Sequence, residues 1–256
     1  MNIRRALRRP RTWLIAVPLV ALLAITAGPF VYINFIKDDP PAKLSFDDLA
    51  ASDNASETTT TSGDGTSTTV APTETTTATS VDTSGVDGTW NVATGSQVGY
   101  RVTEVLFGQD TEGVGRSSDI TGSFVISGTT VTDATFEVDM TTFESDEARR
   151  DDQFDGRIMD VATYPTATFT LTQPIELSAI PDDLVEITTT ATGELTLHGT
   201  TKEVTIDLVA RRNGANIEIT GSLTIVFDEW GIPNPSNAAV STNDEGLLEL
   251  ALVLTR

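Results

Sequence analysis

Apolar and polar residues alternate with a period of two through most of the C-terminal two thirds of the chain. Phe136, Val138 and Met140 are separated by Glu137 and Asp139. The same alternation recurs at residues 124–126, 204–208, 217–227 and 248–254. Because successive side chains of a strand point to opposite faces of a sheet, this pattern predicts half-buried antiparallel strands.

The segments between the expected strands fit this interpretation. Ser127-Gly128 and Asn213-Gly214 are typical of tight hairpin turns. Residues 145–154 lack strand-forming side chains and begin with a Ser that can cap a helix, so we expect a short helix there. About eight strands in residues 86–256 predict an all-β domain, and a meander of that number can close into a barrel without exposed edges. Such a barrel has room for side chains or for one small ligand.

A second pattern lies near the N-terminus, where residues 13–36 form a run of 24 residues without a charge. A helix of that length spans roughly 36 Å, enough to cross a bilayer core of about 30 Å. Five Arg occur in residues 1–12, which predicts a cytoplasmic basic segment, a transmembrane helix at 13–36 and an extracytoplasmic remainder. The alternative is a cleaved signal peptide, with small residues at Ala24, Ala27 and Gly28 as a site for cleavage.

Composition changes again in residues 37–85. Between residues 51 and 85, 19 of the 35 residues are Ser or Thr, and large apolar side chains are rare. Such a segment buries too little surface to offset the entropy of folding. The sequence therefore predicts a disordered Ser/Thr-rich linker at 37–85, followed by the folded domain at 86–256.

Charge and composition exclude several functions. The chain carries 37 acidic and 16 basic residues, a single His and no Cys. An acidic chain is a poor partner for nucleic acid, and the absence of Cys excludes disulfides, thiolate metal sites and a lipoprotein anchor. No arrangement of a nucleophile with a base is recognisable, so we expect neither enzymatic activity nor a cofactor.

Short blocks spread along residues 86–256 carry a family resemblance. They are Trp90, the strand 98–102, Gly122-Ser123-Phe124, Arg150-Asp151, the block 159–169, the block GELTLHGTTKEV at 193–204 and Trp230-Gly231-Ile232. In this order and spacing the domain resembles the YceI-like family of lipid- or polyisoprenoid-binding proteins. The resemblance implies an extended antiparallel eight-stranded lipocalin-like β-barrel with a short helical segment. The chain departs from the family pattern at Tyr100 and Glu104, where a His is common.

The resemblance also implies a partner, an isoprenoid or another long-chain lipid held in the barrel. The apolar residues expected to line such a cavity are Phe124, Phe136, Val138, Phe143, Phe154, Phe169, Leu195, Leu223 and Trp230. Arg150 and Asp151 have two interpretations, either gripping a lipid head group or forming a local ion pair that orients the helix. The alternative to a lipid-binding barrel is a filled barrel that presents its acidic surface to a partner in the cell envelope.

Other polar groups have simpler interpretations. His198 precedes Gly199 between two expected strands, so hydrogen bonding within the turn is its expected role. The carboxylates at 151–160 and 182–183 have the oxygen chemistry of a Ca²⁺ site but lack a twelve-residue loop pattern, so we expect a solvated acidic surface and no metal. The sequence thus predicts a membrane-tethered, extracytoplasmic lipid-binding protein.

Overall fold

In a computed structural model, residues 40–49, 85–106, 108–237 and 240–256 are described. The strands are β1 (Gly88–Val92), β2 (Gln97–Leu106), β3 (Gln109–Ser117), β4 (Ile120–Ser127), β5 (Thr130–Asp139), β6 (Glu144–Ser145), β7 (Thr166–Leu171), β8 (Ile175–Glu176), β9 (Ile187–Leu197), β10 (Thr200–Asn213), β11 (Asn216–Val226), β12 (Val240–Thr242) and β13 (Glu245–Thr255). The helical elements are α3 (Ala148–Gln153), the π-helical turn η2 (Phe154–Ile158) and the 3-10 turns η1 (Met140–Thr142) and η3 (Phe227–Trp230).

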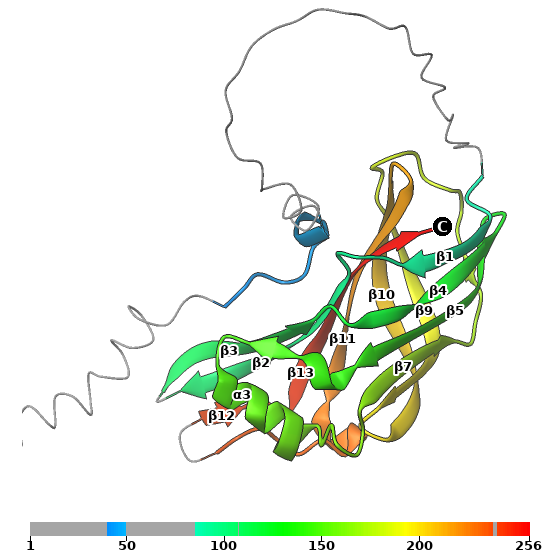
Figure 1. Cartoon of the computed structure of the whole chain (residues 1–256). Coiled ribbons are helices and arrows are strands. Elements are labelled where there is room, and N and C mark those ends of the chain that lie inside the picture. The colour runs from blue at the N-terminus through cyan, green and yellow to red at the C-terminus, as the bar shows by residue number, and fades with distance from the viewer. Residues whose placement is uncertain (1–39, 50–84, 107, 238–239) are drawn as a thin grey trace, which may run out of the picture.

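Eight antiparallel strands close into a barrel in the order β1-β4-β5-β7-β9-β10-β11-β13 (Figure 1). The ring closes where β1 pairs with the end of β13, with Asn91 opposite Thr255. The other end of β13 pairs with β2. β1 and β2 therefore lie one after the other along the same edge of β13. β3 extends the wall beyond β2. The closed ring confirms the predicted all-β, eight-stranded antiparallel barrel.

Short helical elements lie at one end of the barrel. α3 and η2 lie beneath the projecting β2–β3 ribbon, and the β10–β11 hairpin lies at the opposite end (Figure 1). The predicted helix over 145–154 is thus confirmed for residues 148–153. The chain folds this way because 145–154 offers no apolar alternation, whereas Phe154 gives this segment one large side chain to bury.

The apolar strand residues that face into the barrel form two core clusters. One lies near α3 and η3 and includes Phe154, Leu197 and Trp230. The other lies around β1 and β4 and includes Trp90, Phe124 and Leu254. The Trp90 indole donates a hydrogen bond of 2.8 Å to the carbonyl of Val86, which places the start of the domain against the core.

Residues 40–49 depart from the prediction of a disordered 37–85 segment. They form an extended stretch and a helical turn at 46–49 that pack on the barrel, where Leu49 is only 2 % exposed. The prediction was wrong for these ten residues because Leu44, Phe46 and Leu49 together make a small apolar face. The predicted basic segment 1–12, transmembrane helix 13–36 and most of the linker lie outside the described residues. In the described ranges, no helix has the length and apolarity needed to cross a membrane.

Candidate functional site

A cavity of about 570 Å³ runs through the barrel between its two ends. Its wall comes from the inward faces of the barrel strands and of β2, and from α3 and η2. Near the α3 end it is bounded by Leu106, Phe154 and Val240, and near the opposite end by Ile180 and Arg212. The volume lies within the range of about 300–1,000 Å³ typical of small-molecule sites.

The inward-pointing side chains do not fill the barrel. Phe136, Val138, Phe169, Leu208 and Leu250 all line the cavity and are only partly buried. A packed core would bury side chains on this face almost completely, because protein interiors leave few voids larger than a water molecule. The interior is therefore an apolar cavity, and the filled barrel considered as an alternative is not what the structure contains.

Two glycines paired with residues of the cavity wall explain how large aromatic side chains leave this space open. Tyr100 is paired with Gly115 across β2 and β3, and Phe136 is paired with Gly122 across β4 and β5. A Cβ atom added at Gly115 would lie 2.4 Å from the Tyr100 ring, and one at Gly122 would lie 2.8 Å from the Phe136 ring. Each ring thus lies along the wall over a residue without a side chain, and not across the barrel axis.

Three aromatic rings are stacked at the α3 end. The rings of Tyr100 and Phe154 are 4.8 Å apart and nearly parallel, and Phe143 lies 5.1 Å from Phe154 and 6.0 Å from Tyr100. Burial raises the pKa of the Tyr100 phenol well above its ordinary value, with Asp151 and Glu104 adding to the rise and Arg150 opposing it. Tyr100 is therefore neutral at physiological pH and adds an aromatic surface to the cavity.

The raised pKa of Tyr100 predicts an alkaline loss of stability. Its contribution is complete below the ordinary phenol pKa of about 10 and is lost as pH rises, because the unfolded chain releases the proton first. We expect Tyr100→Phe to lose less stability between pH 9 and 11 than the unchanged chain does, as measured by urea unfolding. Equal slopes for the two proteins would contradict the prediction.

Arg150 reaches from α3 into a polar corner of the cavity. Its guanidinium lies 3.7 Å from the Glu104 carboxylate of β2 and also pairs with Asp146. Arg150 and Glu104 both line the cavity, with side chains only 16 % and 14 % exposed. The two carboxylates neutralise much of the positive charge of the guanidinium. The geometry therefore favours the interpretation in which Arg150 forms local ion pairs that orient the helix over the barrel. Asp151 is not part of the cavity wall.

Seven of the nine apolar residues predicted to line a cavity lie along its wall. These are Phe124, Phe136, Val138, Phe143, Phe154, Phe169 and Leu195. Leu223 and Trp230 do not reach the wall; they belong to the core cluster near η3, where Trp230 is 3 % exposed. Contact of any of these residues with a ligand stays a prediction.

The structure adds wall residues that the sequence analysis had not selected. Tyr100, Val102, Glu104 and Leu106 follow Val98 on one face of β2. Their period-two spacing was visible in the sequence and could have identified them. By contrast, Ile158 and Met159 reach the cavity from irregular segments, where no periodicity indicates the direction of a side chain.

His198 and the carboxylate clusters have structural surroundings. His198 and Gly199 form the β9–β10 turn with positive φ values of 50° and 72°. The Nδ1 atom of His198 lies 3.4 Å from the Trp230 carbonyl oxygen, which connects this turn to η3. Within the described part of the chain, no three acidic or His side chains are grouped as a metal site would require.

Solved structures share the fold, among them the following two. BcnA of Burkholderia cenocepacia has 22% sequence identity and a TM-score of 0.50, covering 62% of this chain and 95% of its own. A polyisoprenoid binding domain from Saccharophagus degradans, implicated in plant cell wall breakdown, has 15% identity and a TM-score of 0.52, covering 66% and 98%. No curated protein sequence matches the chain significantly.

The family comparison covers most of the chain. The model of the YceI-like domain matches residues 69–254, which include seven of the eight barrel strands in full and all but the last residue of β13. The match confirms the resemblance drawn from the sequence blocks. The chain therefore belongs to the YceI-like family.

Proposed function

We propose that this protein binds a long apolar lipid, of the polyisoprenoid class, in its barrel and performs no catalysis. The observation that carries the proposal is the unfilled apolar cavity that runs from the α3 end to the β10–β11 end. Burying about 400 Å² of a flexible apolar chain would contribute on the order of 10 kcal/mol before ordering costs are subtracted. Membership of the YceI-like family and the structural likeness to a polyisoprenoid binding domain support this ligand class.

The proposal includes the membrane topology of the protein. Arg4, Arg5, Arg8, Arg9 and Arg11 precede the uncharged run 13–36, which supports a single-pass anchor with a cytoplasmic N-terminus. The barrel then lies outside the cytoplasm, close to the bilayer from which an isoprenoid or other long-chain lipid would come. Nucleic acid has no part in this function, because residues 86–256 carry 28 acidic and only 9 basic side chains.

Affinity as a function of ligand length tests the proposal. The full chain in detergent micelles is titrated with prenyl alcohols of two to eight isoprene units, in competition with a fluorescent apolar probe. We expect affinity to rise with each added unit until the cavity is filled, and then to level off. Lipid extracted from protein purified from its own membranes should contain a long-chain lipid in near-stoichiometric amount. Affinity that does not depend on length, together with an extract that contains no such lipid, would refute a lipid-binding barrel.

A further inference from the structure

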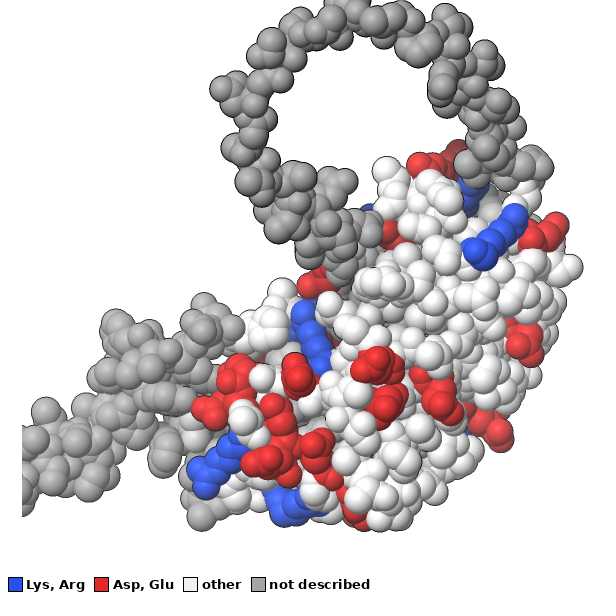
Figure 2. Space-filling view, viewed as in Figure 1, with Lys and Arg blue, Asp and Glu red and all other residues white. Residues whose placement is uncertain are grey.

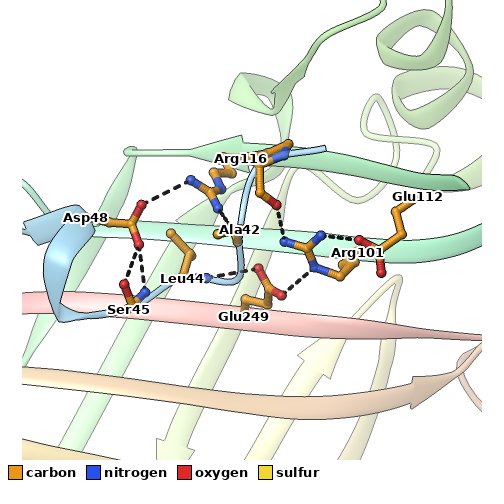
Figure 3. Close-up of polar contacts among 9 residues, drawn as sticks. Ala42, Leu44, Ser45, Asp48, Arg101, Glu112, Arg116 and Glu249 are labelled. Carbon is orange, nitrogen blue, oxygen red and sulfur yellow. Dashed lines mark hydrogen bonds and ion pairs between the residues drawn. The ribbon is translucent and has the colours of Figure 1, made fainter. Parts of the chain in front are cut away.

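Residues 40–49 lie on the outer wall of the barrel, across β2, β3 and β13 (Figures 1 and 3). The helical turn at 46–49 begins with a reciprocal cap: the backbone N–H and hydroxyl of Ser45 donate to the Asp48 carboxylate at 2.8 and 3.0 Å. The Asp48 backbone N–H donates in return to the Ser45 carbonyl. This local structure gives the segment a defined shape with Leu44, Phe46 and Leu49 available for packing.

Polar contacts attach the segment to the wall. Arg101 donates to the carbonyl of Pro41 at 2.8 Å, and the Leu44 backbone N–H donates to Glu249 at 3.4 Å (Figure 3). Arg116 donates to the carbonyl of Ala42 and lies 3.6 Å from the Asp48 carboxylate. These contacts reach strands that are more than fifty residues away in the sequence, so they define a tertiary docking site.

Apolar contacts complete the docking. Leu49, with Leu44 and Phe46, packs on Ala251 and Val253, which point outward from β13. The Arg211 guanidinium lies 4.1 Å from the centre of the Phe46 ring. Ala251 is fully buried although it faces away from the barrel interior, because residues 40–49 cover the wall at this point.

The outer wall of the barrel carries an ion pair that is buried because residues 40–49 lie over it. Arg101 and Glu249 are joined at 2.8 Å, and their side chains are 6 % and 2 % exposed. Side chains on the outer face of a barrel are normally exposed to water, and a buried charge needs a partner with good geometry. Residues 40–49 supply both the cover and two further hydrogen bonds to this pair.

We propose that residues 40–49 are a clasp that docks the barrel on its own membrane stem, with the α3 end toward the bilayer. Only three residues separate Ile36, the end of the apolar run, from Pro40, so their Cα atoms are at most about 14 Å apart. Pro40 and Asp146, which lies just before α3, line the same small surface pocket. The stem therefore reaches the barrel beside α3. This inference rests on the proposed membrane anchor.

The clasp makes a large difference to the position of the barrel. If residues 40–49 were released, the 49 residues from 37 to 85 could extend up to about 160 Å between the bilayer and the domain. Asp and Glu side chains gather over the α3 end in the view of Figure 2. An anionic membrane surface would repel them, so docking on the stem opposes this repulsion and keeps the cavity near its lipid source.

Fluorescence quenching by labelled lipids tests the clasp in the full chain, reconstituted in phosphatidylcholine–phosphatidylglycerol vesicles that contain an acceptor lipid. The chain has no Cys, so Asp152→Cys on α3 and Ala215→Cys on the β10–β11 hairpin each allow a single label. We expect stronger quenching at position 152 than at position 215. Leu49→Asp should release the clasp, lower quenching at position 152 at least twofold and abolish the difference between the two positions.

Two further variants separate release from misfolding. Leu184→Asp makes the same change at a side chain that is 57 % exposed and should leave quenching unchanged. Inserting eight Gly/Ser residues between Asp39 and Pro40 leaves every barrel contact intact. A docked barrel moves away from the bilayer and loses quenching, whereas a barrel held only by the long linker does not respond.

The clasp would be refuted by unchanged quenching in both the Leu49→Asp and insertion proteins, or by stronger quenching at position 215 in the otherwise unchanged chain. Flotation of the vesicles reports membrane anchoring separately. The prenyl alcohol titration of the same protein in detergent micelles reports the proposed function: absence of binding with the quenching pattern intact would refute the lipid cavity and leave the clasp standing.

Discussion

Replacing Glu249 by Ala is expected to lower the free energy of unfolding by about 3 kcal/mol. The substitution removes the carboxylate that accepts from the Arg101 Nε at 2.8 Å and from the Leu44 backbone N–H. Arg101 then remains beneath residues 40–49 with a buried charge that is only partly compensated. The measurement is urea unfolding of a chain of residues 40–256, which keeps the clasp and omits the apolar run.

Two variants test whether burial of the ion pair causes this loss of stability. Glu112 also pairs with Arg101, at 2.6 Å, but it is 37 % exposed, so Glu112→Ala should cost less than about 1 kcal/mol. Replacing both charges, as Arg101→Met with Glu249→Leu, should recover most of the lost stability, because an apolar pair needs no compensation. If Glu249→Ala and Glu112→Ala have equal effects, burial by the clasp is not what makes this ion pair important.

Gly115→Ala is expected to reduce lipid affinity by about tenfold, or roughly 1.4 kcal/mol. The added methyl group would lie 2.4 Å from the Tyr100 ring, and its three nearest neighbours are all atoms of that side chain. The ring must therefore move away from the wall, into the cavity, and give up its stacking on Phe154. Titration with a prenyl alcohol that fills the cavity measures the change, and the shorter alcohols should be affected less.

One control makes the same Gly→Ala change at an uncrowded position, and a second removes the Tyr100 ring that the new methyl group would displace. Gly156→Ala adds a methyl group where no atom lies within 4 Å, so affinity and stability should stay close to their original values. Tyr100→Ala combined with Gly115→Ala removes the ring that would be displaced, and should restore the capacity for a long chain. Lower stability without any loss of affinity in Gly115→Ala would show that Tyr100 moves outward and that the cavity does not depend on this pair.

The inward face of the barrel could be predicted from the sequence, because strand periodicity directly encodes which side chains share a face. Phe124, Phe136 and Val138 follow from this periodicity. Alternation does not determine whether that face is packed or open, since this depends on barrel radius and on what lies opposite each side chain. Gly115 and Gly122 decide this point, and their roles become visible only when strand register is known.

The clasp could not be predicted from residues 40–49 alone, because three apolar side chains in a polar segment bury surface only when a partner is present. The stronger signal lies in β13, where residues 250–254 read Leu-Ala-Leu-Val-Leu without a polar residue. A strand that is apolar on both faces is typical of one covered on both sides. Here the second cover comes from the other end of the chain.

The pairing of β13 has a consequence for the order of folding. This strand, the last in chain order, pairs with β11, β2 and β1, and it alone joins β11 to the two strands nearest the start of the domain. Contacts between Asn91 and Thr255 span nearly the whole domain, which is typical of slowly folding topologies. The ring cannot close until β13 has been synthesised. Until then the edges of β1, β2 and β11 that pair with β13 remain without their hydrogen-bond partners. Export through a narrow channel in an unfolded state would be easier for such a chain than for one whose N-terminal half folds early.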